Sequence, residues 1–266
     1  MEQFYNPAEG KYGISGQVAG MYHLNAWITA FGGFFYDEVT KQLGINSTNT
    51  KEGLKFFIKY VLRYMDVSDL GHDYQRRLFA ESRASIYISG PWDVSFVIRN
   101  IGLENFIVIP YPKVDDRVPR PWSGFRNLYF SVMAEAGGVE RTYASILFIL
   151  YTALSDEALL KLVRENGYVP VKMSVSEYVK THINEHLIYK VVLGFYEQVL
   201  ATVPMPKDAA MQKVWGADTY IQAILQEYSS ALGKGLSVSE AVERAVAVVD
   251  EQLDNAQAKI LSSIGG

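Results

Sequence analysis

The sequence contains no cysteine among its 266 residues. This absence excludes disulfide bonds, thiolate catalysis and cysteine-ligated metals, and it fits either redox compartment. Positive charge is also scarce, because 25 Lys and Arg residues face 29 Asp and Glu residues, and no basic stripe is evident. Nucleic acid is therefore a poor candidate partner.

Long apolar runs are missing as well. The longest, residues 146–151, is far shorter than the ~20 residues that span a bilayer. The chain starts Met-Glu-Gln-Phe, without the basic start and apolar run of a signal peptide. Hydrophobic residues nevertheless make up 49% of the chain, and 18 residues are tyrosine. A sizeable core can form, and aromatic surfaces are available for ligands that have both apolar and polar faces.

Residues 79–92, Phe-Ala-Glu-Ser-Arg-Ala-Ser-Ile-Tyr-Ile-Ser-Gly-Pro-Trp, are the most informative stretch. Residues 84–89 read as a strand because β-branched and aromatic residues lie between turn signals. Gly90 and Pro91 end this strand. Trp92 is then placed at the carboxyl end of the strand, where open α/β sheets bind their ligands. A buried strand and a core tryptophan in another α/β protein is the alternative.

This stretch resembles the helix, strand and Gly-Pro-Trp turn of the maltose-binding-protein-like extracellular solute-binding proteins (family 1) of ABC transporters. The resemblance implies an α/β, periplasmic-binding-protein-like type II fold, helix-rich, comprising the second lobe and part of the first. It also implies that Trp92 stacks on a sugar. The loop Gly-Tyr-Val-Pro-Val at 167–171 and the segment 235–253 are similar to the family too.

The resemblance implies further ligand-binding residues. Tyr22 falls where the family places a sugar-contacting aromatic residue, and Trp215 occupies the position of a second stacking tryptophan. Asn25, Asp93 and Arg126 are candidates for hydrogen bonds to hydroxyl groups, and Trp122 and Arg126 would line the cleft mouth. No catalytic residue, metal or cofactor is expected.

The resemblance also implies a domain organisation. We expect residues 1–122 to form the α/β core of the second lobe, 123–202 the hinge crossing and helices of the first lobe, and 203–266 the return crossing and last helices. The resemblance covers only the C-terminal two-thirds of a family member, so we infer that this sequence is a truncated fragment of such a protein. A signal peptide or lipid anchor would lie in the missing part, leaving the full-length protein either membrane-associated or free in the periplasm.

Residue periodicity predicts the elements of this fold. Helices are expected over 21–31, 49–65 (capped by Asn49), 94–101, 139–154, 156–165, 176–201, 209–232 and 238–260, and strands over 12–14, 84–89, 106–110 and 128–133.

One enzymatic motif competes with a binding role. The sequence His182-Ile-Asn-Glu185-His186 matches the inverted zinc-protease pattern His-x-x-Glu-His. On a helix, the two histidines would share a face, as zinc ligands must. Two solvated or capping histidines are the structural alternative, and no strong third ligand stands out.

The function that follows is the non-enzymatic, substrate-binding component of an ABC importer, extracellular or periplasmic, with a carbohydrate ligand and permease subunits as partners. Maltose, trehalose or a maltodextrin-like oligosaccharide would bind in an inter-lobe cleft. The alternatives are a zinc hydrolase, a binding protein for another solute such as glycerol 3-phosphate, and a helical interaction module.

Overall fold

The computed structural model describes residues 1–125 and 127–264. The chain divides into two compact units, which are described separately. Unit 1 comprises Met1–Ser89, Tyr111–Ser123 and Ala201–Gly266, and unit 2 comprises Gly90–Pro110 and Gly124–Leu200. The sequence-based division at 122 and 202 lies close to two of these boundaries, whereas residues 90–110 group with unit 2 instead of unit 1. The assignment of the units to lobes stays a prediction.

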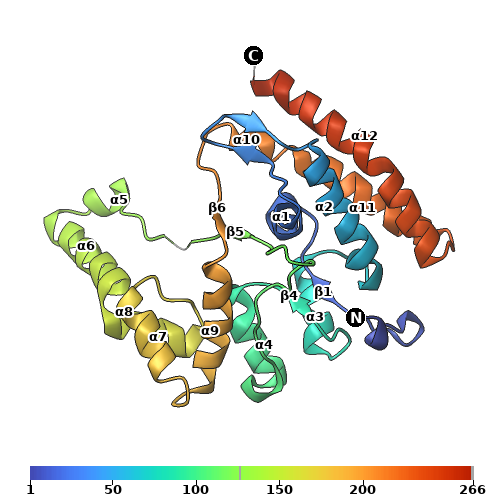
Figure 1. The fold of residues 1–266 in the computed structure, drawn as a ribbon. Helices are drawn as coiled ribbons and strands as arrows, with labels where there is room; N and C mark the ends of the chain where they lie inside the picture. The colour runs from blue at the N-terminus through green and yellow to red at the C-terminus, as the bar shows by residue number, and fades with distance from the viewer. Residues whose placement is uncertain (126, 265–266) are drawn as a thin grey trace. The chain divides into compact units, whose positions relative to one another are not determined.

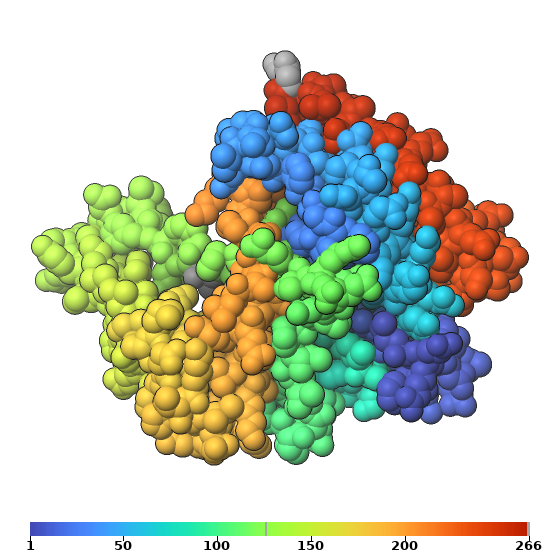
Figure 2. Space-filling model, in the orientation of Figure 1, coloured from blue at the N-terminus to red at the C-terminus, as the bar shows by residue number. Residues whose placement is uncertain are grey.

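Unit 1 is built mainly from helices. Its helices are η1 (Glu2–Phe4), η2 (Pro7–Glu9), α1 (Met21–Ala30), α2 (Thr48–Tyr60), η3 (Leu62–Tyr64), α3 (His72–Ala80), α10 (Met211–Val214), α11 (Ala217–Gly233) and α12 (Val238–Ile264). Its strands are β1 (Ser15–Gly16), β2 (Tyr36–Asp37), β3 (Gln42–Leu43), β4 (Tyr87–Ile88), β5 (Trp122–Ser123) and β6 (Val203–Pro204). In Figure 1, α12, in red, lies along α2 and α11, and Figure 2 shows its red atoms beside the blue atoms of the N-terminal part of unit 1.

The core of unit 1 lies between α1, α2, α11 and α12, whose apolar stripes are buried against one another. Gly53 permits the closest approach of two of these helices. A Cβ atom at this position would lie 2.8 Å from the Ile28 Cα atom and 2.9 Å from the Trp27 carbonyl oxygen. The small residue therefore lets α2 pack directly on the backbone of α1.

The strands of unit 1 are short and pair only two at a time in the described residues. β1 pairs with β4 in parallel, and the isolated bridge between Tyr12 and Ala84 extends the same contact. β2 and β3 form an antiparallel hairpin, and β5 pairs with β6 in parallel. The expected strand at 84–89 is thus present only in part, as β4 and the bridge at Ala84. The strand expected at 12–14 is wrong, because Tyr12 forms only an isolated bridge and β1 lies at Ser15–Gly16.

Unit 2 has a smaller core. Its helices are η4 (Pro91–Asp93), α4 (Val94–Ile101), η5 (Leu103–Asn105), α5 (Val132–Glu135), α6 (Val139–Leu154), α7 (Asp156–Asn166), α8 (Met173–Thr181) and α9 (Leu187–Val199). The buried cluster comprises Val94, Val163, Val179, Ile188, Tyr189, Val191 and Val192. Gly167 ends α7 in the left-handed conformation at φ 69°, which confirms its predicted role as a helix cap.

Helix α6 is largely exposed: within the described residues, none of its side chains is buried. Its exposed apolar side chains are Val139, Tyr143, Ile146, Leu147, Phe148, Leu150, Tyr151 and Leu154. A helix that is apolar on several faces is normally surrounded by other elements. The exposed apolar surface of α6 is therefore of the kind that other polypeptide normally covers.

The predicted strands at 106–110 and 128–133 are wrong. Residues 106–110 have no ladder partner among the described residues. The side chains of this segment still alternate between buried and exposed positions. Phe106 and Val108 pack on the core of unit 2, whereas Ile107 and Ile109 are exposed. Residues 132 and 133 belong to α5. Alternating hydrophobicity reports which side chains are buried, whereas a strand also requires a neighbouring strand.

Three helix predictions also need correction. The expected helix at 209–232 is interrupted by a turn at 215–216 that separates α10 from α11. The expected helix at 176–201 is broken by a turn at 182–185 that separates α8 from α9. Helix α2 is capped by Ser47 and not by Asn49, because the Ser47 hydroxyl accepts a hydrogen bond from the Thr50 amide at 3.3 Å. The predicted capping box of α12 is confirmed, since the Ser237 amide donates to Glu240 and the Glu240 amide to Ser237.

Candidate functional site

An aromatic cluster in unit 1 is centred on Trp122 of β5. Its ring centroid lies 6.4 Å from that of Tyr22 and 5.6 Å from that of Trp215, the latter in an edge-to-face arrangement. Phe35 contacts the same indole at 5.8 Å. Trp122 is buried, whereas Tyr22 and Trp215 are only partly buried. Three residues predicted to bind ligand are therefore brought together from positions far apart in the sequence.

The start of α1 is fixed beside the start of α11, and this contact positions the cluster. The Met21 amide donates a hydrogen bond of 2.7 Å to the Asp218 carboxylate. Trp215 lies directly before this region, at the break between α10 and α11. Burial raises the pKa of Asp218, and the Met21 amide partly opposes that shift. The carboxylate thus serves as the cap of α1 and aligns Tyr22 with Trp215.

Tyr111, a partly buried tyrosine, supplies a hydroxyl group near the cluster. Tyr111 contacts Trp27 edge-to-face at 5.4 Å. Burial, and then the neighbouring Tyr22, raise the pKa of the Tyr111 phenol well above its ordinary value. This phenol stays neutral at physiological pH, so it can both donate and accept hydrogen bonds.

Asn25, predicted to bind a hydroxyl group, is buried and also has a structural role. Its Nδ2 atom donates to the Arg120 carbonyl at 3.2 Å, and Thr29 Oγ1 donates to the same oxygen at 3.0 Å. The Arg120 amide donates in turn to Thr29 Oγ1 at 2.9 Å. These bonds fix the chain directly before Trp122 against α1. Asn25 and Trp122 also line a shared hollow of about 460 Å³ in unit 1.

The remaining predicted site residues lie elsewhere. Trp92 and Asp93 belong to unit 2, where Trp92 is half-exposed and Asp93 is buried. Arg126 lies outside the described residues. Sequence reasoning missed Phe35 and Arg120, which only the tertiary contacts connect with Trp122. The Phe-Gly-Gly-Phe-Phe stretch at 31–35 was the available signal, because two glycines between aromatic residues permit a close approach of the backbone.

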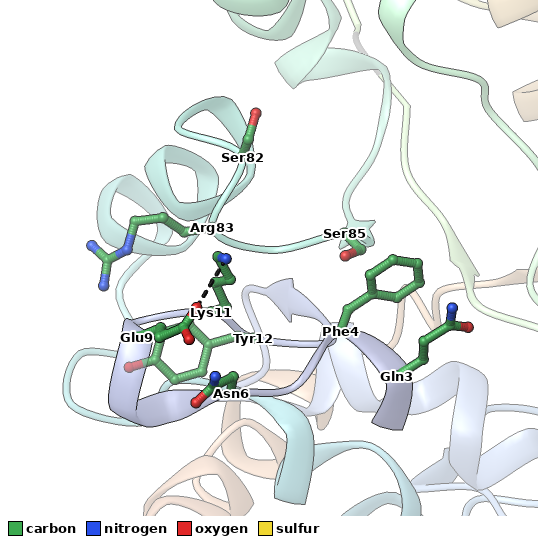
Figure 3. A pocket seen from close by; sticks show the side chains of 9 residues that line it. All are labelled: Gln3, Phe4, Asn6, Glu9, Lys11, Tyr12, Ser82, Arg83 and Ser85. Atoms are coloured by element: carbon green, nitrogen blue, oxygen red, sulfur yellow. Dashed lines mark hydrogen bonds and ion pairs between the residues drawn. The ribbon is translucent and has the colours of Figure 1, made fainter.

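A second hollow, of about 430 Å³, is polar and lies at the N-terminal end of unit 1. It is lined by Gln3, Phe4, Asn6, Glu9, Lys11, Tyr12, Ser82, Arg83 and Ser85 (Figure 3). The Lys11 ammonium group pairs with Glu9 at 3.0 Å. None of these nine residues was predicted to bind ligand, and none belongs to the aromatic cluster.

The zinc-protease motif does not adopt the geometry that it requires. His182 caps the end of α8 and His186 precedes α9, so the two imidazoles do not share a helical face. His182 Nδ1 is bonded to the Tyr178 carbonyl at 2.8 Å, and the His182 ring stacks on that of Tyr178. Among residues 1–125 and 127–264, no group of three or more His, Cys, Asp or Glu residues could hold a metal ion.

The described helices include none that is both long and apolar enough to cross a membrane.

The burial of His23, next to Tyr22 in α1, predicts that the stability of the protein depends on pH. Burial, and then the nearby His72, lower the pKa of His23 to about 4 from 6.5. The unfolded chain therefore binds this proton first as the pH falls. We expect the free energy of unfolding to be highest above pH 6.5 and to fall between pH 6.5 and about 4, by about 3 kcal/mol at most. Urea denaturation over this pH range measures the effect.

The control compares two histidine substitutions. His23→Gln should remove most of the loss of stability between pH 6.5 and 4, whereas His72→Gln should keep most of it, because burial is the larger cause. An identical pH dependence in wild type and His23→Gln would contradict the assignment.

Comparison with known structures defines the fold. The chain superposes on a cyclo/maltodextrin-binding protein complexed with maltotetraose with a TM-score of 0.63 and 24% identity, covering 95% of this chain and 63% of that one. For the maltose/maltodextrin-binding domain from Bdellovibrio bacteriovorus bound to maltotriose, the TM-score is 0.65 and the identity 16%, covering 95% and 64%. The chain therefore has the periplasmic-binding-protein-like fold of maltodextrin-binding proteins, which confirms the predicted fold class.

Among curated sequences, the chain is similar to the maltotriose-binding protein of Pyrococcus abyssi (strain GE5 / Orsay). The two are 30% identical over 253 residues, which cover 89% of this chain and 53% of that protein. The chain thus spans about half the length of this relative and less than two-thirds of the structures above. No protein-family model matches the chain.

Proposed function

We propose that this chain is part of the substrate-binding component of an ABC importer that takes up a maltodextrin-type sugar. The contact of Trp122 with both Tyr22 and Trp215 carries this proposal. The 30% identity to a maltotriose-binding protein supports it. The protein would act by binding alone, as a non-enzymatic component whose closed form contacts the permease subunits. Its location would be extracellular or periplasmic.

The chemistry of the cluster suits a sugar. The C–H faces of a pyranose ring stack on flat aromatic rings, and its hydroxyl groups need fixed polar partners. Tyr22 and Trp215 are partly exposed, so they are accessible for stacking, and Trp122 supports them from behind. Such a surface favours maltose, trehalose or a longer maltodextrin over a charged solute such as glycerol 3-phosphate.

Unit 2 would complete the protein in two ways. Trp92, half-exposed, would supply another stacking ring, with Asp93 and Arg126 as candidate hydrogen-bonding groups. The apolar surface of α6 would pack against further polypeptide of the same two-lobed fold. In this proposal unit 2 is the part of the first lobe that residues 123–202 were expected to form, together with residues 90–110.

Intrinsic tryptophan fluorescence tests the proposal. We expect maltose or maltotriose to produce a saturable change in emission, because Trp122 and Trp215 lie in the proposed site. Trehalose and glycerol 3-phosphate are titrated in parallel to define the solute class. A saturable response to glycerol 3-phosphate alone would replace sugar with a phosphorylated solute. No response to any of these up to millimolar concentrations would contradict sugar binding by this chain.

Stoichiometric zinc in the purified protein, lost in His186→Ala, would instead favour the hydrolase.

A further inference from the structure

The hollow beside Trp122 contains the groups that a second sugar-binding position needs. Its volume of about 460 Å³ lies within the range of small-molecule sites. Trp122 and Phe35 are aromatic residues of its lining, and Gly32 and Gly33 also line it. All of its lining residues belong to unit 1.

The polar groups of the hollow carry both signs of charge. Asp37, Glu38 and Arg120 are the charged residues among those that line it. Hydrogen bonds from the backbone of Thr40 and Val39 lower the pKa of Asp37, so its carboxylate stays ionised and accepts strongly. Two acidic residues and one basic residue line the hollow, so it can offer both acceptors and donors to the hydroxyl groups of a neutral molecule.

Asn25 adds a fixed polar group to the wall. Its side chain is 1% exposed and its Nδ2 atom is used by the Arg120 carbonyl. Within residues 1–125 and 127–264, its Oδ1 atom has no hydrogen-bond partner. Since the residue lines the hollow, this oxygen can accept a bond from a ligand hydroxyl.

The walls of the hollow are fixed before any ligand arrives. β5 and β6 pair through Trp122 and Val203, and the Val203 amide donates to the Pro121 carbonyl at 3.0 Å. On the opposite wall, the Lys207 amide donates to Glu38 at 2.7 Å. Lys41 pairs with Asp208 in the same region. These contacts join three segments that are distant in sequence, 38–41, 121–122 and 203–208, so little conformational entropy remains to be lost on binding.

We propose that this hollow is a second binding position for a neutral saccharide, separate from the partly exposed faces of Tyr22 and Trp215. The inference rests on the proposed sugar-binding function and extends it to Asn25, Asp37 and Arg120. Trp122 lines the hollow and also contacts Trp215. A ligand bound in the hollow should therefore change the environment of the Trp122 indole.

Fluorine NMR of the chain labelled with 5-fluorotryptophan tests this position, with maltose and glucose as probes. The four tryptophans give separate signals, assigned by single Trp→Phe substitutions. We expect maltose to shift the Trp122 signal saturably. Arg120→Met should weaken this response roughly tenfold, because a charged hydrogen bond is lost. This variant keeps the wall intact, since Asn25 and Thr29 contact only the Arg120 backbone.

Asp37→Asn is the second variant, because an amide oxygen can still accept the turn bonds of Val39 and Thr40. It should also weaken the Trp122 response, while the Trp215 signal still shifts at unchanged maltose concentrations. If both variants leave every titration unchanged while Trp215 still responds, the hollow is not a binding position and the proposed function stands. If no tryptophan signal responds to either sugar in wild type, both proposals fail.

Discussion

Trp215→Ala is expected to weaken sugar binding by this chain roughly 30-fold or more. Trp215 is partly exposed and contacts Trp122, so its ring is an accessible face of the aromatic cluster. Removing a central aromatic residue from a binding site typically costs about 2 kcal/mol or more, which is roughly 30-fold in affinity. Isothermal titration calorimetry with maltotriose measures the loss.

Two controls separate binding from folding. Trp215→Phe keeps an aromatic face and should retain most of the affinity. The thermal midpoint of both variants should stay near that of wild type, because the side chain is not fully buried. Wild-type affinity in Trp215→Ala would remove Trp215 from the site, and equal losses in both variants would show that the indole itself is required.

Gly194→Ala is expected to destabilise unit 2 severely. A Cβ atom at Gly194 of α9 would lie 2.1 Å from the Val108 carbonyl oxygen, a backbone atom that cannot rotate away. The segment 106–110 would have to move, and with it Phe106 and Val108, which pack on the core of this unit. Overpacking of this kind costs about 2–3 kcal/mol or more. Urea denaturation followed by far-ultraviolet circular dichroism measures the loss.

Gly233→Ala is the matched control. This glycine is the last residue of α11, and a Cβ atom there would meet nothing within 4 Å. Alanine also favours a helix over glycine by up to about 1 kcal/mol, so this variant should be as stable as wild type or more stable. Equal stability of the two variants would contradict the close packing of 106–110 on α9. Trp92, the tryptophan of unit 2, provides a local fluorescence probe.

Helices with long apolar periodicity could be predicted from the sequence. Residues 139–154, for example, form α6 with the expected bounds. The periodicity could not reveal that none of the α6 side chains is buried within the described residues, because burial depends on what packs against a helix. The break at 182–185 was also missed, since the apolar spacing continues from α8 into α9 across the turn.

The candidate site was predictable only in part. Tyr22, Trp122 and Trp215 were singled out by resemblance to a family, and the structure brings their rings into contact. The sequence offered no reason to connect Arg120 with Asn25, because a hydrogen bond to a backbone carbonyl has no residue signature. The zinc-protease motif was predicted from residue spacing and does not form a metal site in the structure. Its two histidines would share a face only on a continuous helix, and they lie on either side of a turn.

The sequence by itself determined the helix-rich character of the chain, its capping residues at Gly167 and Ser237, and the absence of thiol chemistry. These properties depend on residue type and local spacing. The tertiary structure alone decided the division into two units, the pairing of β5 with β6 and the contact of three aromatic rings around Trp122. Such contacts join residues up to 193 positions apart, Tyr22 and Trp215, and depend on how the helices pack. Local periodicity carries no information about that packing.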